Sequence, residues 1–241
     1  RFVEMNDIDS VFWNRSYEPW QINRDTIIKA DLLKTGCNVE SFNGSLLWEP
    51  WQVMKKDGTP YKVFTPFYRK GCLSAKKPRL PIGKPKFSLI EEDEYCGKAK
   101  LSELNLIPNE NWGEKIIRNW NVGEEGAHSR FNDFLDNGLI GYKEGSNFPN
   151  NNNVSRLSAY LHWGQISINT VWHKSKSYAN LKKINEQDAD QFFAELGWRE
   201  FSNSLLYYFP QLPDENLQER FNNFKWSNNF DFLHAWQRGK T

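Results

Sequence analysis

The sequence predicts an α/β segment followed by an all-α segment, and three observations indicate this fold class. Residues 1–50 contain a strand, a helix and a second strand in turn. Residues 51–124 contain six prolines and no regular apolar period. Residues 125–241 place apolar side chains at helical spacing. We therefore expect an α/β unit, a long irregular connection and a helical domain, with boundaries near residues 50 and 124.

The α/β unit is predicted from two short apolar runs on either side of an amphipathic segment. Residues 10–13 suit a buried strand, residues 25–34 carry the apolar stripe of a helix that Gly36 closes, and residues 38–42 alternate as a returning strand. This order is typical of a parallel sheet. Because two strands do not complete a layer, we expect further strands upstream of Arg1 and interpret the chain as an internal fragment.

The connection is rich in basic side chains. Between Lys55 and Ser88 there are ten basic residues and one acidic residue, Asp57. One interpretation is a strip that binds phosphate groups, and the other is a solvated, lysine-rich linker. No glycine-rich or aromatic pattern is interleaved with the charges, which favours the linker.

The helical domain is predicted from apolar periodicity. Phe131, Phe134 and Leu135 fall with Leu139 on one helical face, and Ser155 is placed to cap a helix that begins near residue 157. Further helical segments are expected at residues 166–172, 189–208 and 230–236, the second of them ended by Pro210.

Composition excludes several classes of protein. A net charge of +1 gives no global field for nucleic acid, and no apolar run reaches the roughly 18 residues of a membrane span. Three scattered cysteines exclude a disulfide scaffold or zinc site and favour a reducing compartment, so we expect a monomeric, cytoplasmic protein. The four histidines lack partners at metal-binding spacing, so no metal site is expected. Aromatic residues are unusually frequent, at 15%.

Residues 154–158 (Val-Ser-Arg-Leu-Ser) are the first candidate binding segment. Two hydroxyls and a guanidinium lie at a loop-to-helix junction, where unpaired N–H groups would favour an anion such as a diphosphate. The alternative is an ordinary helix cap with an incidental arginine. The residues alone leave these two interpretations about even.

The second candidate is the helical segment that contains Glu195, Trp198 and Arg199. Spacings of three and four residues predict that these side chains share a helix face. A carboxylate, a large ring and a guanidinium on one face can hold a flat heterocycle by hydrogen bonding and stacking. The alternative, an amphipathic helix with a Glu–Arg pair over a packed Trp, is the commoner arrangement when this segment is taken alone.

Six segments, in this order and spacing, resemble the photolyase/cryptochrome family. They are residues 11–19, 61–67, 131–149, 155–167, 195–201 and 235–241. The likeness extends over nearly the whole chain and is greatest to class I deoxyribodipyrimidine photolyases. It implies the C-terminal part of a Rossmann-like antenna domain in residues 1–50, an interdomain linker in residues 51–124, and the N-terminal part of a helical FAD-binding domain in residues 125–241.

The resemblance also implies a function. In photolyases, reduced FAD donates an electron under light to a pyrimidine dimer in damaged DNA, and the dimer splits. This implies a deoxyribodipyrimidine photolyase, a carbon–carbon lyase, for the full-length parent, whereas the 241-residue fragment alone is expected to be inactive and to bind little FAD. The alternative is a cryptochrome-type blue-light receptor that binds FAD without repair, and the Glu195/Trp198 pair favours repair. The resemblance also allows a second antenna chromophore beside FAD. Its identity is not assigned, because Trp20 and Gln21 stand where folate-binding members have a polar pair.

Site residues follow from the same resemblance. Tyr142 is expected near the flavin nucleotide, and the diphosphate is expected on Val154, Ser155, Arg156, Leu157 and Ser158. Glu195 and Trp198 would contact the dimer as catalytic residues, and Arg199 would lie between the flavin pocket and the DNA. Two positions depart from the family pattern: Val154 replaces a threonine, and Ser146 replaces an arginine that often contacts DNA phosphate.

Overall fold

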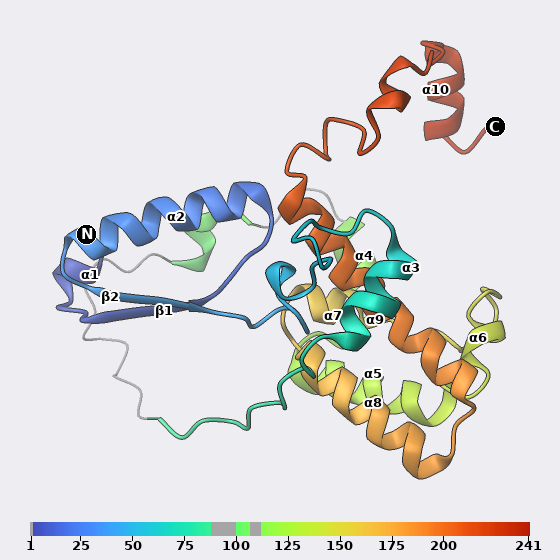
Figure 1. Ribbon diagram of the computed structural model, residues 1–241, viewed down its shortest axis with the longest axis horizontal. Coiled ribbons are helices and arrows are strands. Elements are labelled where there is room, and N and C mark those ends of the chain that lie inside the picture. Colours follow the sequence, from blue (N-terminus) through green and yellow to red (C-terminus); the bar gives the residue numbers. More distant parts are fainter. Residues whose placement is uncertain (1, 88–99, 107–111) are drawn as a thin grey trace.

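A computed structural model describes residues 2–87, 100–106 and 112–241 of the chain, which form an α/β unit and a larger helical body (Figure 1). The α/β unit contains α1 (Phe2–Met5), β1 (Ser10–Asn14), α2 (Pro19–Lys34) and β2 (Asn38–Phe42). The two strands are parallel, with Ser10 opposite Asn38 and Asn14 opposite Phe42. The predicted strand–helix–strand order is therefore confirmed.

Helix α2 differs from its prediction in two respects. It begins at Pro19, six residues earlier than expected, because proline suits the first turn of a helix. Its apolar stripe also stays in contact with solvent, since the side chains of Ile27 and Leu33 are 55% and 54% exposed. A two-stranded sheet is too narrow to cover a whole helix face.

The prediction of an irregular connection is wrong for residues 64–74, which are helical and packed into the core. This stretch contains α3 (Phe64–Pro66), a π turn η2 (Phe67–Gly71) and a 3₁₀ turn η3 (Cys72–Ser74). The side chains of Phe67, Tyr68 and Cys72 are buried, whereas those of Arg69 and Lys70 are exposed. Proline breaks and a short length hide this amphipathic pattern from a search for longer periods.

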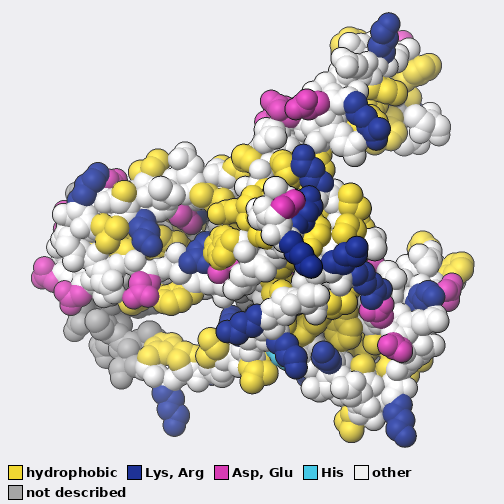
Figure 2. All heavy atoms as spheres, in the orientation of Figure 1, with side chains coloured by type: hydrophobic (Ala, Val, Ile, Leu, Met, Phe, Trp, Pro, Cys, Tyr) yellow, Lys and Arg dark blue, Asp and Glu magenta, His cyan; other side chains and the backbone are white. Residues whose placement is uncertain are grey.

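Basic side chains gather on the surface above this stretch (Figure 2). Shorter elements in the remaining connection are η1 (Pro50–Gln52), η5 (Leu101–Leu104) and α4 (Trp112–Ile117). Ser88, the end of the basic stretch, lies outside the described residues.

The helical body confirms the predicted periodicity. Its helices are α5 (Glu124–Asn137), α6 (Tyr142–Gly145), α7 (Ser158–His162), α8 (Ile168–Lys182) and α9 (Glu186–Tyr208). The predicted apolar face of α5 is buried, and it packs with the buried side chains of Phe192, Leu196 and Phe201 from α9. Asn185 caps α9 by accepting a hydrogen bond from the N–H of Gln187 at 2.9 Å, so this helix begins three residues before the predicted start.

The last segment of the chain extends away from the helical body (Figure 1). It contains η6 (Glu219–Asn223) and the predicted helix at the end of the chain, α10 (Phe230–Gln237). The side chains of Phe230 and Trp236 are 74% and 70% exposed. Among the described residues, no helix combines the length and apolar character that crossing a bilayer requires.

Candidate functional site

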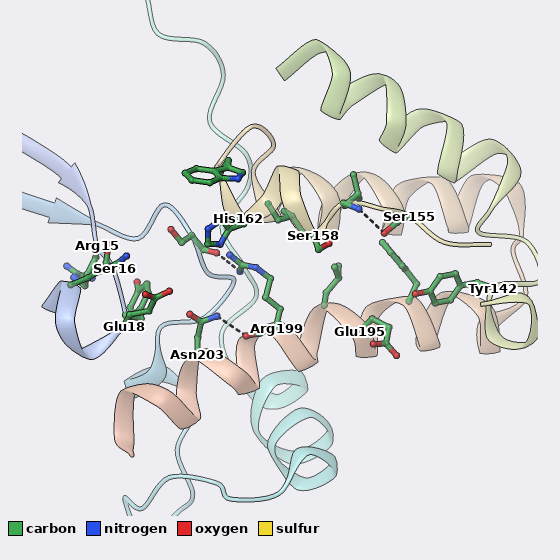
Figure 3. A pocket seen from close by; sticks show the side chains of 18 residues that line it. Arg15, Ser16, Glu18, Tyr142, Ser155, Ser158, His162, Glu195, Arg199 and Asn203 are labelled. Carbon is green, nitrogen blue, oxygen red and sulfur yellow. Dashed lines mark hydrogen bonds between the residues drawn. The ribbon is translucent and has the colours of Figure 1, made fainter. Parts of the chain in front are cut away.

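A cavity of about 630 Å³ lies where α9, the segment before α7 and the residues after β1 meet (Figure 3). This volume is in the range of small-molecule sites. Tyr142 lies at one end, and Arg15 and Glu18 lie at the other. The cavity therefore has walls from both the α/β unit and the helical body.

Six of the nine predicted site residues line this cavity together: Tyr142, Ser155, Leu157, Ser158, Glu195 and Arg199. The other three, Val154, Arg156 and Trp198, do not. Among the described residues, no group of three histidine, cysteine or acidic side chains is arranged to hold a metal ion.

The segment before α7 does not form the predicted helix cap. Helix α7 begins at Ser158, and the Oγ of Ser155 instead accepts a hydrogen bond from the N–H of Leu157 at 3.4 Å, ahead of the helix. Because α7 has only five residues, its dipole contributes little to an anion site. The interpretation based on a helix N-terminus is therefore wrong for this segment.

Its backbone nevertheless has the geometry of an anion-binding nest. Arg156 has a φ of +54°, in the left-handed region, and Leu157 follows in the right-handed helical region. Successive N–H groups in such a pair turn toward one side and form a concavity for anions. No described residue accepts a hydrogen bond from the N–H of Ser155 or Arg156. Sequence reasoning missed this feature, because a left-handed arginine has no compositional signal.

The guanidinium of Arg156 has a different location from the predicted one. It lines a second cavity of about 720 Å³, together with Arg130, Asp133 and Tyr160. Arg156 is not among the residues that line the first cavity, so its guanidinium does not hold an anion there. The segment 154–158 separates the two cavities.

Tyr142 forms a rigid apolar wall of the first cavity. Its ring packs edge-on against Phe134 and Phe192, with ring centroids 5.6 and 5.5 Å apart. Burial, with a smaller contribution from the nearby charge of Glu195, raises the pKa of Tyr142 to about 12. The side chain is thus a neutral phenol over the ordinary pH range.

Helix α9 separates the side chains that were predicted to share a face. Glu195 and Arg199 both line the cavity (Figure 3), whereas the indole of Trp198 stacks on Phe64 of α3, with ring centroids 3.7 Å apart and planes within 10°. Because each residue turns the helix by about 100°, Trp198 lies on the side of Glu195 away from Arg199. One face of the Trp198 ring is covered by Phe64, and the side chain remains 45% exposed.

Arg199 and Glu200 attach α9 to the chain that follows β2. Arg199 donates a hydrogen bond to the carbonyl of Ser45 at 2.6 Å. The fully buried carboxylate of Glu200 accepts hydrogen bonds from the N–H groups of Leu47 and Trp48 at 2.9 and 3.1 Å. Burial raises the pKa of Glu200 to about 7, although Arg199 and these N–H groups oppose the shift. Sequence reasoning missed the burial of Glu200. The only sequence feature that points to it is the position of this acidic residue next to the apolar stripe of α9.

The α/β unit also contributes a polar cluster that sequence reasoning missed. Arg15 forms an ion pair with Glu49 and donates to the carbonyl of Ser41 at 2.8 Å. The hydroxyl of Tyr17 donates to the same carboxylate at 2.8 Å. Burial, followed by the bond to Glu49, raises the pKa of Tyr17 above its ordinary value. The sequence signal for Arg15 and Tyr17 was their location just after β1, at the carboxyl edge of a parallel sheet.

Comparisons with known proteins agree on one family. The profile of the DNA photolyase family matches residues 1–86, and that of the FAD binding domain of DNA photolyase matches residues 192–241. A deoxyribodipyrimidine photo-lyase of Agrobacterium fabrum is 38% identical over 97% of this chain and 48% of its own length. Cryptochrome-2 of Arabidopsis thaliana is 30% identical over 99% of this chain and 40% of its own length.

Solved structures give the same result. A bacterial class III photolyase from Agrobacterium tumefaciens matches with a TM-score of 0.88 and 36% identity, over 98% of this chain and 48% of that one. A Synechocystis cryptochrome, at 18% identity and a TM-score of 0.73, shares the fold; it covers 99% of this chain and 50% of that one. The chain spans about half the length of the curated relatives it matches. Assignment to class I stays a prediction, since a class III structure is among the matches.

Two profiles in the expected order, an identity of 38% with a photo-lyase and a TM-score of 0.88 lead to one conclusion. The chain belongs to the DNA photolyase/cryptochrome family, and it contains a stretch of the photolyase α/β domain followed by a stretch of the helical FAD-binding domain.

Proposed function

We propose that this chain takes part in the light-driven repair of pyrimidine dimers in DNA, with reduced FAD as the electron donor. One observation carries the proposal: the cavity lies between a segment that contains an anion-binding nest, at Arg156 and Leu157, and an exposed carboxylate, Glu195. The nest suits a cofactor diphosphate, and the carboxylate suits a base that donates hydrogen bonds. The identity of 38% with a deoxyribodipyrimidine photo-lyase supports this interpretation.

The donors in the cavity fit the diphosphate of FAD. A diphosphate offers only acceptors. Ser155 and Ser158, which line the wall, offer hydroxyls, and the N–H groups of Ser155 and Arg156 have no described partner. Val154 adds no hydroxyl, so we propose that its part is limited to its backbone, and Leu157 supplies an apolar edge. When bound and reduced, FAD supplies the photoexcited electron. The protein holds the cofactor and orients the DNA beside it.

Glu195 and Trp198 suit recognition of a dimer that has left the base stack. Both side chains are exposed on adjacent sides of α9. The carboxylate can accept a hydrogen bond from a pyrimidine N–H, and the open face of the indole can stack against the bases. Arg199 lines the cavity beside Glu195, so we propose that it lies between cofactor and DNA.

A cryptochrome-type photoreceptor is the second candidate, because cryptochrome-2 of Arabidopsis thaliana is 30% identical. The exposure of both Glu195 and Trp198 favours repair. A protein that only signals has no need for a carboxylate and an open ring at the mouth of its cofactor cavity.

The test uses the protein purified as its full-length gene product, its absorption spectrum and a thymine oligonucleotide that carries a cyclobutane dimer. We expect a flavin spectrum and a light-dependent return of thymine absorbance. Glu195→Gln should slow this return with flavin content unchanged, and Glu144→Gln, which removes an exposed carboxylate outside the cavity, should have no effect. Flavin without repair would indicate the photoreceptor instead, and protein without flavin would refute both candidates.

A further inference from the structure

We propose that Arg130 is a positioning residue that turns the N–H groups of Ser155 and Arg156 toward the cofactor diphosphate. This inference rests on the proposed binding of FAD. Arg130 lies on α5 and lines the second cavity, on the far side of segment 154–158 from the proposed diphosphate site. Its part is therefore to hold the backbone that would bind the phosphates.

Arg130 holds two successive carbonyl groups of this segment. Its Nη2 donates to the carbonyl oxygen of Val154 at 3.0 Å, and its Nε donates to that of Ser155 at 3.2 Å. A planar guanidinium can make both bonds at once, because its donors lie in a fixed fork. The two peptide planes are thus held by one rigid group.

Holding the carbonyls sets the direction of the N–H groups. In a trans peptide, the C=O of one residue and the N–H of the next point in opposite directions. The described peptides have no cis bonds. Drawing the carbonyls of Val154 and Ser155 toward Arg130 therefore directs the N–H groups of Ser155 and Arg156 away from it. No described residue accepts a hydrogen bond from either of these N–H groups.

A second interaction fixes the guanidinium itself. Its Nη1 donates to the Oδ2 of Asp133 at 2.8 Å, one turn along α5, and the Oδ1 of Asp133 accepts from the Nδ2 of Asn137 at 2.9 Å. Asp133 neutralises the charge of Arg130, so the arginine supplies direction and little attraction for an anion. The left-handed conformation of Arg156 is strained and needs such support from its surroundings.

The test measures the preference of the full-length protein for FAD over riboflavin, which has the same ring system and no phosphate. Dissociation constants come from flavin fluorescence. We expect Arg130→Met to weaken FAD binding about tenfold and to leave riboflavin binding unchanged, as expected from loss of a charge-assisted contact. Arg130→Lys should give an intermediate loss, because one ammonium cannot serve both carbonyls in a fixed plane.

Arg69→Met is the matched control. Arg69 also holds an aspartate, Asp190, with two hydrogen bonds at 3.1 and 2.5 Å, and it touches neither cavity. The Arg69→Met substitution should leave the preference for FAD over riboflavin unchanged. Thermal unfolding of each variant separates binding from stability, since a merely structural role for Arg130 would lower the melting temperature and keep the preference for FAD.

The outcomes also separate this inference from the proposed function. If the unsubstituted chain binds FAD no more tightly than riboflavin, the diphosphate site itself is refuted. If the unsubstituted chain prefers FAD and Arg130→Met keeps that preference, the diphosphate site stands and the positioning role of Arg130 is refuted.

Discussion

The buried carboxylate of Glu200 predicts an unusual dependence of stability on pH. Most carboxylates in folded proteins have lowered pKa values and stabilise the fold as pH rises. Glu200 has a pKa raised from 4.5 to about 7, chiefly because burial disfavours its charged form. The folded chain therefore binds this proton more tightly than the unfolded chain does. The contribution of Glu200 to stability is greatest below pH 4.5 and falls as pH rises through 7.

The size of this effect follows from the two pKa values. A shift from 4.5 to about 7 corresponds to roughly 3 kcal/mol of unfolding free energy, lost between acid and mildly alkaline pH. The charged and polar groups that face the carboxylate are Arg199 on the same helix, the N–H groups of Leu47 and Trp48, and the thiol of Cys72 on η3. Burial raises the pKa of this thiol as well, so it stays neutral over the range and the change belongs to Glu200.

The assay is urea unfolding at a series of pH values, followed by circular dichroism, for the unsubstituted chain and for Glu200→Gln. The glutamine keeps the shape and one acceptor for the N–H groups of Leu47 and Trp48 but cannot ionise. We expect the difference in unfolding free energy between the two chains to change by roughly 3 kcal/mol between pH 4.5 and 8, in favour of the glutamine at high pH. A difference that is flat with pH, or that moves in favour of the glutamate, would refute the reasoning.

Four further predictions concern helix propensity, packing and surface charge. In Gly197→Ala, the added Cβ would lie 2.5 Å from the Cδ2 of Tyr68, so urea unfolding should show a loss of about 2 kcal/mol that exceeds the helix-propensity gain of about 1 kcal/mol. Gly113→Ala in α4, where a Cβ meets no described atom within 4 Å, should instead stabilise by up to about 1 kcal/mol, and a loss there would contradict the propensity argument. A double-mutant cycle of Phe64→Leu and Trp198→Leu should give a coupling of about 1 kcal/mol from the ring stack, and strictly additive losses would indicate no stacking energy. Arg69→Met should change stability by less than about 1 kcal/mol, because the Arg69–Asp190 pair is solvent-exposed; a larger loss would mean that the pair is better shielded from water than its exposure indicates.

Apolar periodicity was sufficient to predict most of the regular elements. The strands at residues 10–14 and 38–42, the face of α5 and the long helix α9 each repeat apolar residues over a full element. The turns at residues 64–74 were missed because no single helical period runs through them; α3, the π turn and the 3₁₀ turn have different spacings. A core segment of this kind is specified by its contacts with α9, which a local pattern does not contain.

The segments that form the candidate site could be predicted from the sequence, but the directions of several of their side chains could not. Tyr142, Ser155 and Glu195 lie far apart in the sequence, and their presence in one cavity follows from tertiary packing. The direction of Arg156 could not be predicted, because a single left-handed residue sends its side chain into the opposite cavity. The separation of Trp198 from Arg199 was available from helical geometry, since a step of one residue turns the helix by about 100°.

The same geometry explains why a short stretch of α9 carries so much information. Four consecutive residues at about 100° intervals point in four directions around a helix. Trp198 stacks on Phe64, and Arg199 donates a hydrogen bond to the carbonyl of Ser45. Glu200 accepts hydrogen bonds from the N–H groups of Leu47 and Trp48, and the ring of Phe201 contacts that of Phe67. Each direction meets a segment that is distant in sequence, so a change at any one position loosens a different attachment. Ser202, the next residue of α9, has an exposed side chain and attaches the helix to no distant described segment, so substitutions there should be tolerated.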